Sequence, residues 1–301
     1  MQTTQVSLSI IIPCFNHGKF IMDAISSVEE CQEKVYEIII VNDGSTDPYT
    51  CEVMEQLKKK GYFVVEQENL GLSAARNTRI KLAKGQYILP LDSDNKIRPN
   101  YIFKGIEILD KLPEVGVVYG DAEYFGDKSG LWKVPEFDLR LLLLGNYIDA
   151  CAVFRKSVWE DCGYYDTEMP KIGYEDWNFW LDAAKNGWKF YHIPEVLFDY
   201  RVRAGSMVTN CNIPENQRLL IQYVANKHSD ILREEYQKLY VEFNAVSEKW
   251  QKIRGIYLYK IYQFLSKIYQ LDVKTIFKYL SLKKSTRASD NLIAAKAKTT
   301  K

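Results

Sequence analysis

The sequence lacks the features of a secreted or membrane-spanning protein. Met1–Gln5 is polar and leads directly into an apolar segment, without the basic region that opens a signal peptide. No run reaches the roughly 18 consecutive apolar residues expected of a spanning helix. The six cysteines form no Cys-x-x-Cys pair and have no histidine at zinc spacing. We therefore expect a cytoplasmic protein in a reducing compartment, without a disulfide framework or a zinc cluster.

The sequence also lacks the glycine motifs that cradle phosphates in two large enzyme classes. No Gly-x-Gly-x-x-Gly follows the first apolar segment, and no Gly-x-x-x-x-Gly-Lys occurs. Pyrophosphate binding by a glycine-rich loop is therefore not encoded. A Rossmann-type dehydrogenase or a nucleotidyltransferase fits the sequence poorly.

What is present is ordinary globular composition with an uneven charge. The 301 residues are 47% hydrophobic and 26% charged, which is enough for one large domain and an appendage. Residues 249–301 hold 13 Lys and Arg against two acidic residues, and 27 basic and 37 acidic residues precede them. The tail therefore carries +11 and the rest −10, a division that predicts contact between the tail and an anionic surface.

Short apolar segments alternate with helical ones in the first hundred residues. The segments with the composition of buried strands are 8–13, 37–42, 62–66 and 87–91. Strands that alternate with helices predict an α/β domain with a mostly parallel sheet and helices on both faces. Ligands of such sheets bind beyond the carboxyl ends of the strands, where Asn42, Asp43, Asp92 and Asp94 are expected.

The order of elements is harder to read beyond residue 112. We expect further strands at 116–119, 149–154 and 188–192, and an amphipathic helix at 175–187. The later chain is predicted to be helical, with a segment from Ser229 to about Leu282 that is broken near Gly255. The expected organisation is a catalytic domain at 1–208, a helical extension at 209–282 and a basic, disordered tail at 283–301.

Two aspartates at a predicted strand end form a candidate metal site. Asp92 and Asp94 flank Ser93, an arrangement that suits a hard divalent cation bridging a diphosphate. By itself this pattern is weak, because aspartates at strand exits are common as caps and turns.

Asp92 and Asp94 belong to one of five motifs that occur in a fixed order. These motifs are a strand ending in proline, Asp-Gly-Ser after the second strand, Gly-Leu-Ser-Ala-Ala-Arg-Asn, Leu-Asp-x-Asp and Glu-Asp-Trp, and they run from residue 8 to 177. The chain resembles family 2 of the inverting glycosyltransferases over roughly its first two thirds. The resemblance implies the GT-A fold, a UDP-sugar donor and a Mn²⁺ or Mg²⁺ cofactor.

The resemblance also implies a nucleotide pocket. The residues expected to border it at the first strand are Pro13, Phe15 and Asn16. Asp43 would accept a hydrogen bond from the uracil or ribose, and Asn69 and Arg76 would line the base and diphosphate regions. The alternative for Arg76 is a residue on a helix surface. Asp92 would contact the ribose or the sugar.

The reacting groups follow from the same resemblance. Asp94 would be the main metal ligand, and Asp176 the general base that activates the acceptor hydroxyl. The alternative for Asp176 is a helix-start carboxylate held by the helix dipole. Glu175 would orient the acceptor, and Tyr174, Trp177 and Trp180 would contact the sugar, although a core position for Trp180 stays open.

One position departs from the family pattern. Many relatives carry a histidine that reaches the metal or diphosphate, and Arg203 occupies that position here. A guanidinium cannot ligate a cation but can hold phosphate, so we expect Arg201 and Arg203 to clamp the leaving diphosphate. His192 comes too early to replace the missing histidine and is expected to be structural.

The leading hypothesis is therefore a transferase that acts on a saccharide or lipid-linked acceptor in surface polysaccharide or glycolipid synthesis. The alternative is a catalytically silent sugar-nucleotide-binding scaffold on the same fold. Lysines beside an apolar face with Trp250 and Tyr257 predict a peripheral contact with the inner face of the plasma membrane. Packing on the domain or on a second subunit stays open. The acidic first part and the absence of a recognised module argue against nucleic acid.

Overall fold

The computed structural model describes residues 6–31 and 35–269, except for the side chains of residue 262 and residues 265–269. The chain divides into two compact units, Met1–Arg233 and Glu234–Lys301, and each is described by itself. The predicted tail at 283–301 lies outside the described residues.

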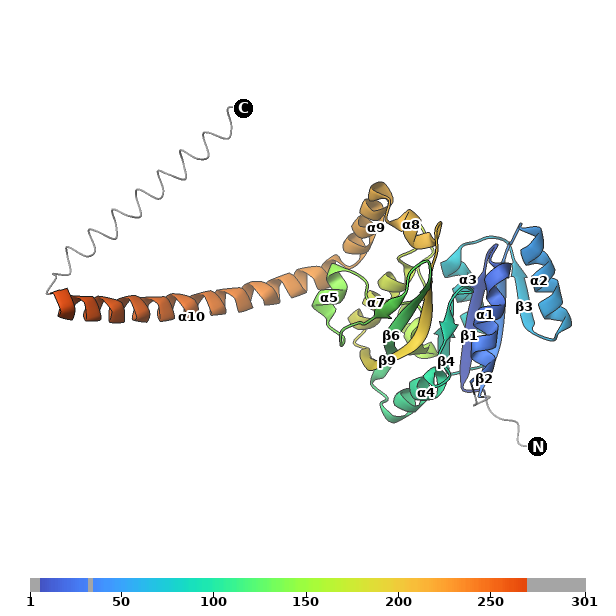
Figure 1. Cartoon of the computed structure of the whole chain (residues 1–301), viewed down its shortest axis with the longest axis horizontal. Helices are drawn as coiled ribbons and strands as arrows, with labels where there is room; N and C mark the ends of the chain where they lie inside the picture. The colour runs from blue at the N-terminus through green and yellow to red at the C-terminus, as the bar shows by residue number, and fades with distance from the viewer. Residues whose placement is uncertain (1–5, 32–34, 270–301) are drawn as a thin grey trace, which may run out of the picture. The chain divides into compact units, whose positions relative to one another are not determined.

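The first half of the large unit is a run of parallel strands with helical crossovers. Its strands are β1 (Leu8–Cys14), β2 (Tyr36–Asp43), β3 (Phe63–Gln67) and β4 (Tyr87–Pro90), in the sheet order β3-β2-β1-β4. Its helices are α1 (Gly18–Glu29), α2 (Pro48–Lys59) and α3 (Leu72–Leu82). All three strand pairs are parallel, which confirms the βαβ prediction. Figure 1 shows these elements in blue and cyan.

The second half of the sheet is mixed, with antiparallel pairs beside the parallel ones. Its strands are β5 (Lys96–Ile97), β6 (Val115–Gly126), β7 (Gly130–Trp132), β8 (Val153–Arg155) and β9 (Lys189–Val202). β8 is antiparallel to both of its neighbours, β4 and β6, while β6 and β9 are parallel. β8 enters the sheet from a loop rather than a helical crossover, and a parallel strand would need that crossover.

The predicted strand at 149–154 was too long for a physical reason. The Cys151 amide donates to Oδ1 of Asp149 at 2.8 Å, and the Ala152 amide donates to the Ala150 carbonyl at 2.8 Å. These turn hydrogen bonds occupy backbone amides that strand pairing would otherwise use, so β8 begins only at Val153. Asp149 therefore belongs to a loop that leads toward the centre of the sheet.

Two hydrophobic layers cover the two faces of the sheet. Successive residues of a strand point to opposite faces, so Ile10 and Ile12 pack under α1, α2 and α4 (Tyr101–Lys111), while Ile11 packs on the other side. The helices of the second layer are α3, α5 (Leu139–Leu144), α6 (Lys156–Asp161) and α7 (Glu175–Lys185). This three-layer arrangement confirms helices on both faces.

The large unit continues past residue 208, where the catalytic domain is predicted to end. α8 (Met207–Cys211) and α9 (Pro214–Lys227) follow β9, and Leu220 and Val224 of α9 are buried. Val224 packs in the same layer as Trp159. The compact unit therefore extends to Arg233, and the functional division at 208 stays a prediction.

The helix α10 (Ser229–Tyr269) contains the whole described part of the second unit. It runs without interruption through Gly255, so the predicted break there is wrong. A single glycine costs a helix only about 1 kcal/mol, which neighbouring helix formers offset. Within residues 6–31 and 35–269, no helix is long and apolar enough to cross a membrane.

Candidate active site

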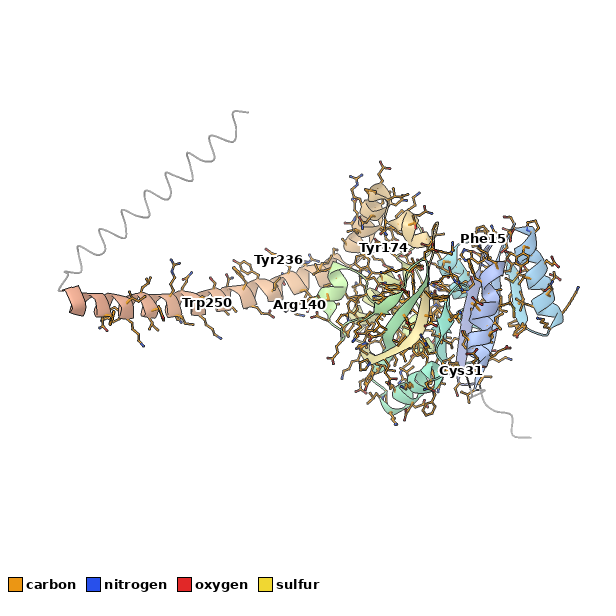
Figure 2. All side chains as sticks on the ribbon, in the orientation of Figure 1. Phe15, Cys31, Arg140, Tyr174, Tyr236 and Trp250 are labelled. Carbon is orange, nitrogen blue, oxygen red and sulfur yellow. The ribbon has the colours of Figure 1, made fainter. Side chains whose placement is uncertain are left out.

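Parallel pairing brings the polar ends of β1, β2 and β4 to one edge of the sheet. Cys14 is paired with Asn42, and Ile11 with Pro90, so the loops after residues 14, 43 and 90 all leave the sheet on the same side. Figure 2 labels Phe15, in the loop after β1, and Tyr174, directly before α7. The loops that carry the predicted site residues are therefore neighbours in space.

The loop after β1 is tied to the loop after β2 through Asn16. Its Oδ1 accepts hydrogen bonds from the Thr46 and Asp47 amides, both at 2.8 Å, and its φ of 57° is in the left-handed region. Phe15, which precedes it, is 42% exposed, and Pro13 is buried. Asn16 therefore shapes this loop through contacts within the protein.

Asp43 holds the loop that is predicted to contact the base. One carboxylate oxygen accepts from Gln67 Nε2 at 2.7 Å and from the Leu70 amide at 3.1 Å, and the other accepts from the Gly71 amide at 3.1 Å. Asn69 lies exposed in the same loop. Asp43 is thus engaged with its own protein in this structure, and its contact with uracil or ribose stays a prediction.

Arg76 lies at the centre of the acidic side chains. Its side chain is fully buried, Nη2 donates to Asp92 Oδ1 at 2.9 Å, and Nη1 donates to Glu175 Oε1 at 3.0 Å. Burial opposes the charge of the guanidinium, but Asp92 and Glu175 outweigh it and raise the pKa of Arg76. The alternative of a surface helix residue is therefore wrong. A contact with diphosphate stays a prediction.

Asp94 meets the two arginines that follow β9. Arg203 Nε donates to Asp94 Oδ2 at 3.0 Å, and Arg201 Nε donates to the Asp94 carbonyl at 2.9 Å. Arg201 also pairs with Asp23 and lies over the ring of Phe20, 4.6 Å from its centroid. Arg201 therefore holds the Asp94 loop. Both arginines already form ion pairs with aspartates in this structure, and their contact with a diphosphate stays a prediction.

Asp176 opens α7 with its carboxylate held on both sides. Oδ1 accepts from the Trp177 amide at 2.7 Å, and Oδ2 accepts from Asn146 Nδ2 at 3.0 Å. Burial raises the pKa of Asp176 well above that of an ordinary aspartate, and the charges of Glu175 and Asp149 reinforce the rise. A carboxylate with a raised pKa is a stronger base than usual, as proton abstraction requires.

The aromatic residues beside Asp176 divide into core and edge. Trp177 is only 6% exposed, and its Nε1 donates to the Leu142 carbonyl at 2.6 Å. The predicted contact between Trp177 and a sugar is therefore corrected, because the ring belongs to the hydrophobic core. Tyr174 is half-buried and meets Trp177 edge-on at 5.4 Å between ring centroids. Its contact with the sugar stays a prediction.

A hollow of about 220 Å³ opens beside Glu175. Its other walls come from residues 70–73, where α3 begins, and from residues 166–172, before α7. Glu175 itself is fixed from two sides, because Oε2 accepts from the Gly173 amide at 2.9 Å and Oε1 is held by Arg76. The hollow thus adjoins both the predicted nucleotide loop and the predicted catalytic pair.

The structure adds site residues that the sequence did not single out. His17 Nε2 accepts from Arg203 Nη2 at 2.6 Å, and Asn146 holds Asp176. Burial raises the pKa of Asp149 to about 7, with Asp92 as the next cause. His192, as expected, is structural and contacts Asp121 at 3.2 Å. Asn146 and Asp149 lie in the loop before β8, and Asp149 was expected in a strand rather than at the site.

A mixed sheet of this order, with acidic loops at the carboxyl ends of its parallel strands, defines a GT-A fold. The chain belongs to glycosyl transferase family 2, whose family model matches residues 9–163. The match includes the candidate residues from Pro13 to Asp94 and ends before Glu175 and Asp176.

Curated relatives agree with this membership. The chain is 30% identical over 210 residues to poly-β-1,6-N-acetyl-D-glucosamine synthase of Staphylococcus epidermidis, a match that covers 65% of this chain and 47% of the relative. The corresponding synthase of Staphylococcus aureus is 30% identical over 176 residues, covering 54% and 42%. The matched region therefore spans about half the length of these curated relatives.

Solved structures share the fold at lower identity. TarS 1-349 of S. aureus in complex with UDP-GlcNAc has a TM-score of 0.59 at 20% identity, over 72% of this chain and 66% of that chain. A mannosyltransferase from Pyrobaculum calidifontis, in complex with GDP-Man and Mn²⁺, has a TM-score of 0.53 at 18% identity, over 69% and 60%. These similarities concern the fold.

Proposed function

We propose that the protein is an inverting glycosyltransferase that moves a sugar from a UDP-sugar to a hydroxyl of a saccharide or lipid-linked saccharide. The observation that carries the proposal is the arrangement of Asp176, a carboxylate of raised pKa, beside the Arg76 network that reaches Asp92 at the strand ends. Membership in family 2 supports the reaction class. The curated relatives are poly-β-1,6-N-acetyl-D-glucosamine synthases, which supports polysaccharide synthesis here.

The proposed reaction is a single displacement. Asp176 takes the proton of the acceptor hydroxyl, and the oxygen attacks the anomeric carbon as the bond to the UDP oxygen breaks. The electron pair of that bond leaves with the β-phosphate. Asn146 holds Oδ2 of Asp176, which keeps the carboxylate oriented for the proton transfer. One displacement inverts the configuration of the anomeric carbon.

The chemistry of the donor set fits a hard divalent cation at Asp94. Mg²⁺ and Mn²⁺ are bound by one or two carboxylates together with phosphate oxygens, and a cationic group of the protein already lies against Asp94 Oδ2. In the described part of the chain, no cluster of three or more His, Cys, Asp or Glu is placed to hold a metal. When bound, the ion would neutralise charge on the departing diphosphate.

Release of UDP from a panel of UDP-sugars tests the proposal, with UDP-GlcNAc as the first donor because the curated relatives make an N-acetylglucosamine polymer. We expect turnover with Mn²⁺ that a chelator abolishes, and a loss on the order of 100-fold for Asp94→Ala, since one ligand of the ion is removed. The control is Asp110→Ala, because Asp110 lies on α4, away from the carboxyl ends of the strands, and accepts a hydrogen bond from Tyr87 of β4.

A native chain that binds UDP but releases none from any donor would support the alternative, a silent sugar-nucleotide scaffold. Turnover that persists in excess chelator would remove the metal from the proposal and leave the transferase. The two results separate the reaction from its cofactor.

We further propose that the protein works on the cytoplasmic face of the membrane through α10. Trp250 and Tyr257 are 66% and 68% exposed on this helix, and residues 249–301 carry 13 basic residues against two acidic ones. An aromatic face beside lysines is attracted to an interface with anionic lipid. Such a contact would bring the site to a lipid-linked acceptor.

Sedimentation with vesicles tests this contact. The full chain is expected to pellet with vesicles of phosphatidylglycerol. The double variant Trp250→Ser/Tyr257→Ser is expected to bind about tenfold more weakly, because it lacks the two aromatic rings that would be buried in the lipid interface. The matched control is Tyr236→Ser/Tyr240→Ser, which removes two exposed tyrosines of the same helix outside the basic region. A full chain that stays in the supernatant would refute the membrane contact and favour packing on a second subunit.

A further inference from the structure

The Arg203 guanidinium bridges two side chains from distant loops. Its Nε donates to Asp94 Oδ2 at 3.0 Å, and its Nη2 donates to His17 Nε2 at 2.6 Å. His17 follows β1, Asp94 follows β4 and Arg203 follows β9, so the contact exists only in the folded sheet. The other ring nitrogen of His17 faces Ser93 Oγ at 3.5 Å.

Both partners of Arg203 present a lone pair to a positive charge. A nitrogen that accepts a hydrogen bond from a guanidinium is unprotonated, and the guanidinium always donates. An unprotonated imidazole nitrogen and a carboxylate oxygen are both ligands that proteins use for first-row divalent metals. Two protein ligands are also the number that leaves room for phosphate oxygens around Mg²⁺ or Mn²⁺.

We infer that His17 Nε2 and Asp94 Oδ2 form a two-ligand site for a divalent cation, and that Arg203 is a displaceable cation occupying it. The divalent ion enters when the guanidinium leaves, so Arg203 and the ion compete for the same two atoms. His17 thereby supplies an imidazole nitrogen next to the Asp94 carboxylate. The inference deepens the proposed function. Only the role of the ion in the transfer reaction rests on that proposed function.

The surroundings of Arg203 allow such an exchange. Its side chain is 22% exposed, and that of Asp94 is 16% exposed, so the pair lies at the edge of the protein rather than in its core. The guanidinium also lies over the ring of Phe20, at 5.5 Å from the centroid. By contrast, Arg201 beside it is held by Asp23 and by the Asp94 carbonyl and is not free to exchange.

Binding of Mn²⁺ alone to the full chain, measured by electron paramagnetic resonance without donor or acceptor, tests the inference. Arg203→Met is expected to bind Mn²⁺ about tenfold more tightly than the native chain, because the competing cation is gone. The matched control is Arg98→Met, which removes a guanidinium paired with Glu123 and Asp199, and whose Mn²⁺ affinity is expected to equal that of the native chain.

A second measurement identifies the nitrogen ligand. Pulsed resonance of Mn²⁺ bound to Arg203→Met is expected to show coupling to a ¹⁴N nucleus, and Arg203→Met/His17→Gln to lose it together with the gained affinity. Arg203→Lys provides a variant that keeps the charge but cannot bridge both atoms, and intermediate affinity is expected. Thermal unfolding of each variant shows whether it is folded.

Equal or weaker Mn²⁺ affinity in Arg203→Met, or a folded variant without ¹⁴N coupling, would overturn the inference and leave Arg203 as a structural ion pair. The result does not depend on the transfer reaction. A chain that binds Mn²⁺ as expected but releases no UDP would disprove the proposed function and keep the cation site, and the reverse outcome is equally distinguishable.

Discussion

Asp176→Asn is expected to lower kcat on the order of 10³-fold while the KM for the donor stays nearly unchanged. The substitution keeps the shape of the side chain and an oxygen for the Trp177 amide, but an amide cannot take a proton from the acceptor hydroxyl. General bases contribute roughly 10² to 10⁴ in rate, and 10³ corresponds to about 4 kcal/mol of transition-state stabilisation. Steady-state rates of UDP release with saturating acceptor measure the effect.

The pH profile provides an independent reading of the same residue. Only the carboxylate form of Asp176 accepts a proton, and burial with Glu175 and Asp149 raises its pKa. The active form is therefore lost as the pH falls, and kcat/KM is expected to decline well above the pH at which an ordinary aspartate is protonated. Burial also raises the pKa of Asp149 to about 7, and the two carboxyl groups interact. The acidic limb of the pH profile therefore gives an apparent pKa of the pair rather than of Asp176 alone.

The control for Asp176 is Asp182→Asn on the same helix. Asp182 is paired with Lys227, away from the acidic network around Arg76, so its substitution is expected to leave kcat within about twofold. If Asp176→Asn retained more than a tenth of the native kcat with an unchanged acidic limb, Asp176 would be a helix-start carboxylate of structural value only.

Arg76→Met is expected to reduce the free energy of unfolding by about 3 to 5 kcal/mol. The guanidinium is fully buried and is shared by Asp92 and Glu175, so its removal leaves carboxylates without their counter-charge. Breaking a buried ion pair by removing one partner has this cost, because the remaining charge stays desolvated without an opposite charge to compensate it. Urea unfolding at pH 7.5, followed by circular dichroism, measures the change.

Arg79→Met, one turn later on the same helix, separates charge from packing. Arg79 is 6% exposed, burial lowers its pKa, and it forms no ion pair with a carboxylate among the residues the structure describes. It is expected to cost less than about 1 kcal/mol. Combining Arg76→Met with Glu175→Gln and Asp92→Asn should recover at least half of the loss. Equal effects of Arg76→Met and Arg79→Met would mean that the arginine is held by packing.

Much of the fold and part of the site follow from local patterns. The first four strands and the helices between them are short, periodic and bounded by turns, and their parallel order was confirmed by the strand pairs. Asp92 and Asp94 come directly after such a strand, so their edge of the sheet was predictable. Asp176 was readable as a helix start, because an acidic residue in a first turn is favoured by the helix dipole.

The remainder of the site depends on contacts between distant parts of the chain. Nothing near His17 predicts that it meets Arg203, 186 residues away, and the pairing of Arg76 with Glu175 joins residues 99 apart. The predicted sugar contact of Trp177 was wrong because the sequence places the ring on a helix face without stating what that face meets. Asp149 escaped notice because it was assigned to a predicted strand, whereas turn hydrogen bonds hold it in a loop beside the site.

The amino-acid sequence alone therefore determined the class of fold, the edge of the sheet that carries the acidic loops, and the residue types gathered there. Backbone propensity, strand alternation and turn chemistry act over a few residues, and these features depend on them. The tertiary structure decided which charges meet: Arg76 became the centre of an acidic network, and Arg203 came to lie between His17 and Asp94. Charge pairing and burial depend on distances across the whole sheet, and those distances exist only after the strands have packed.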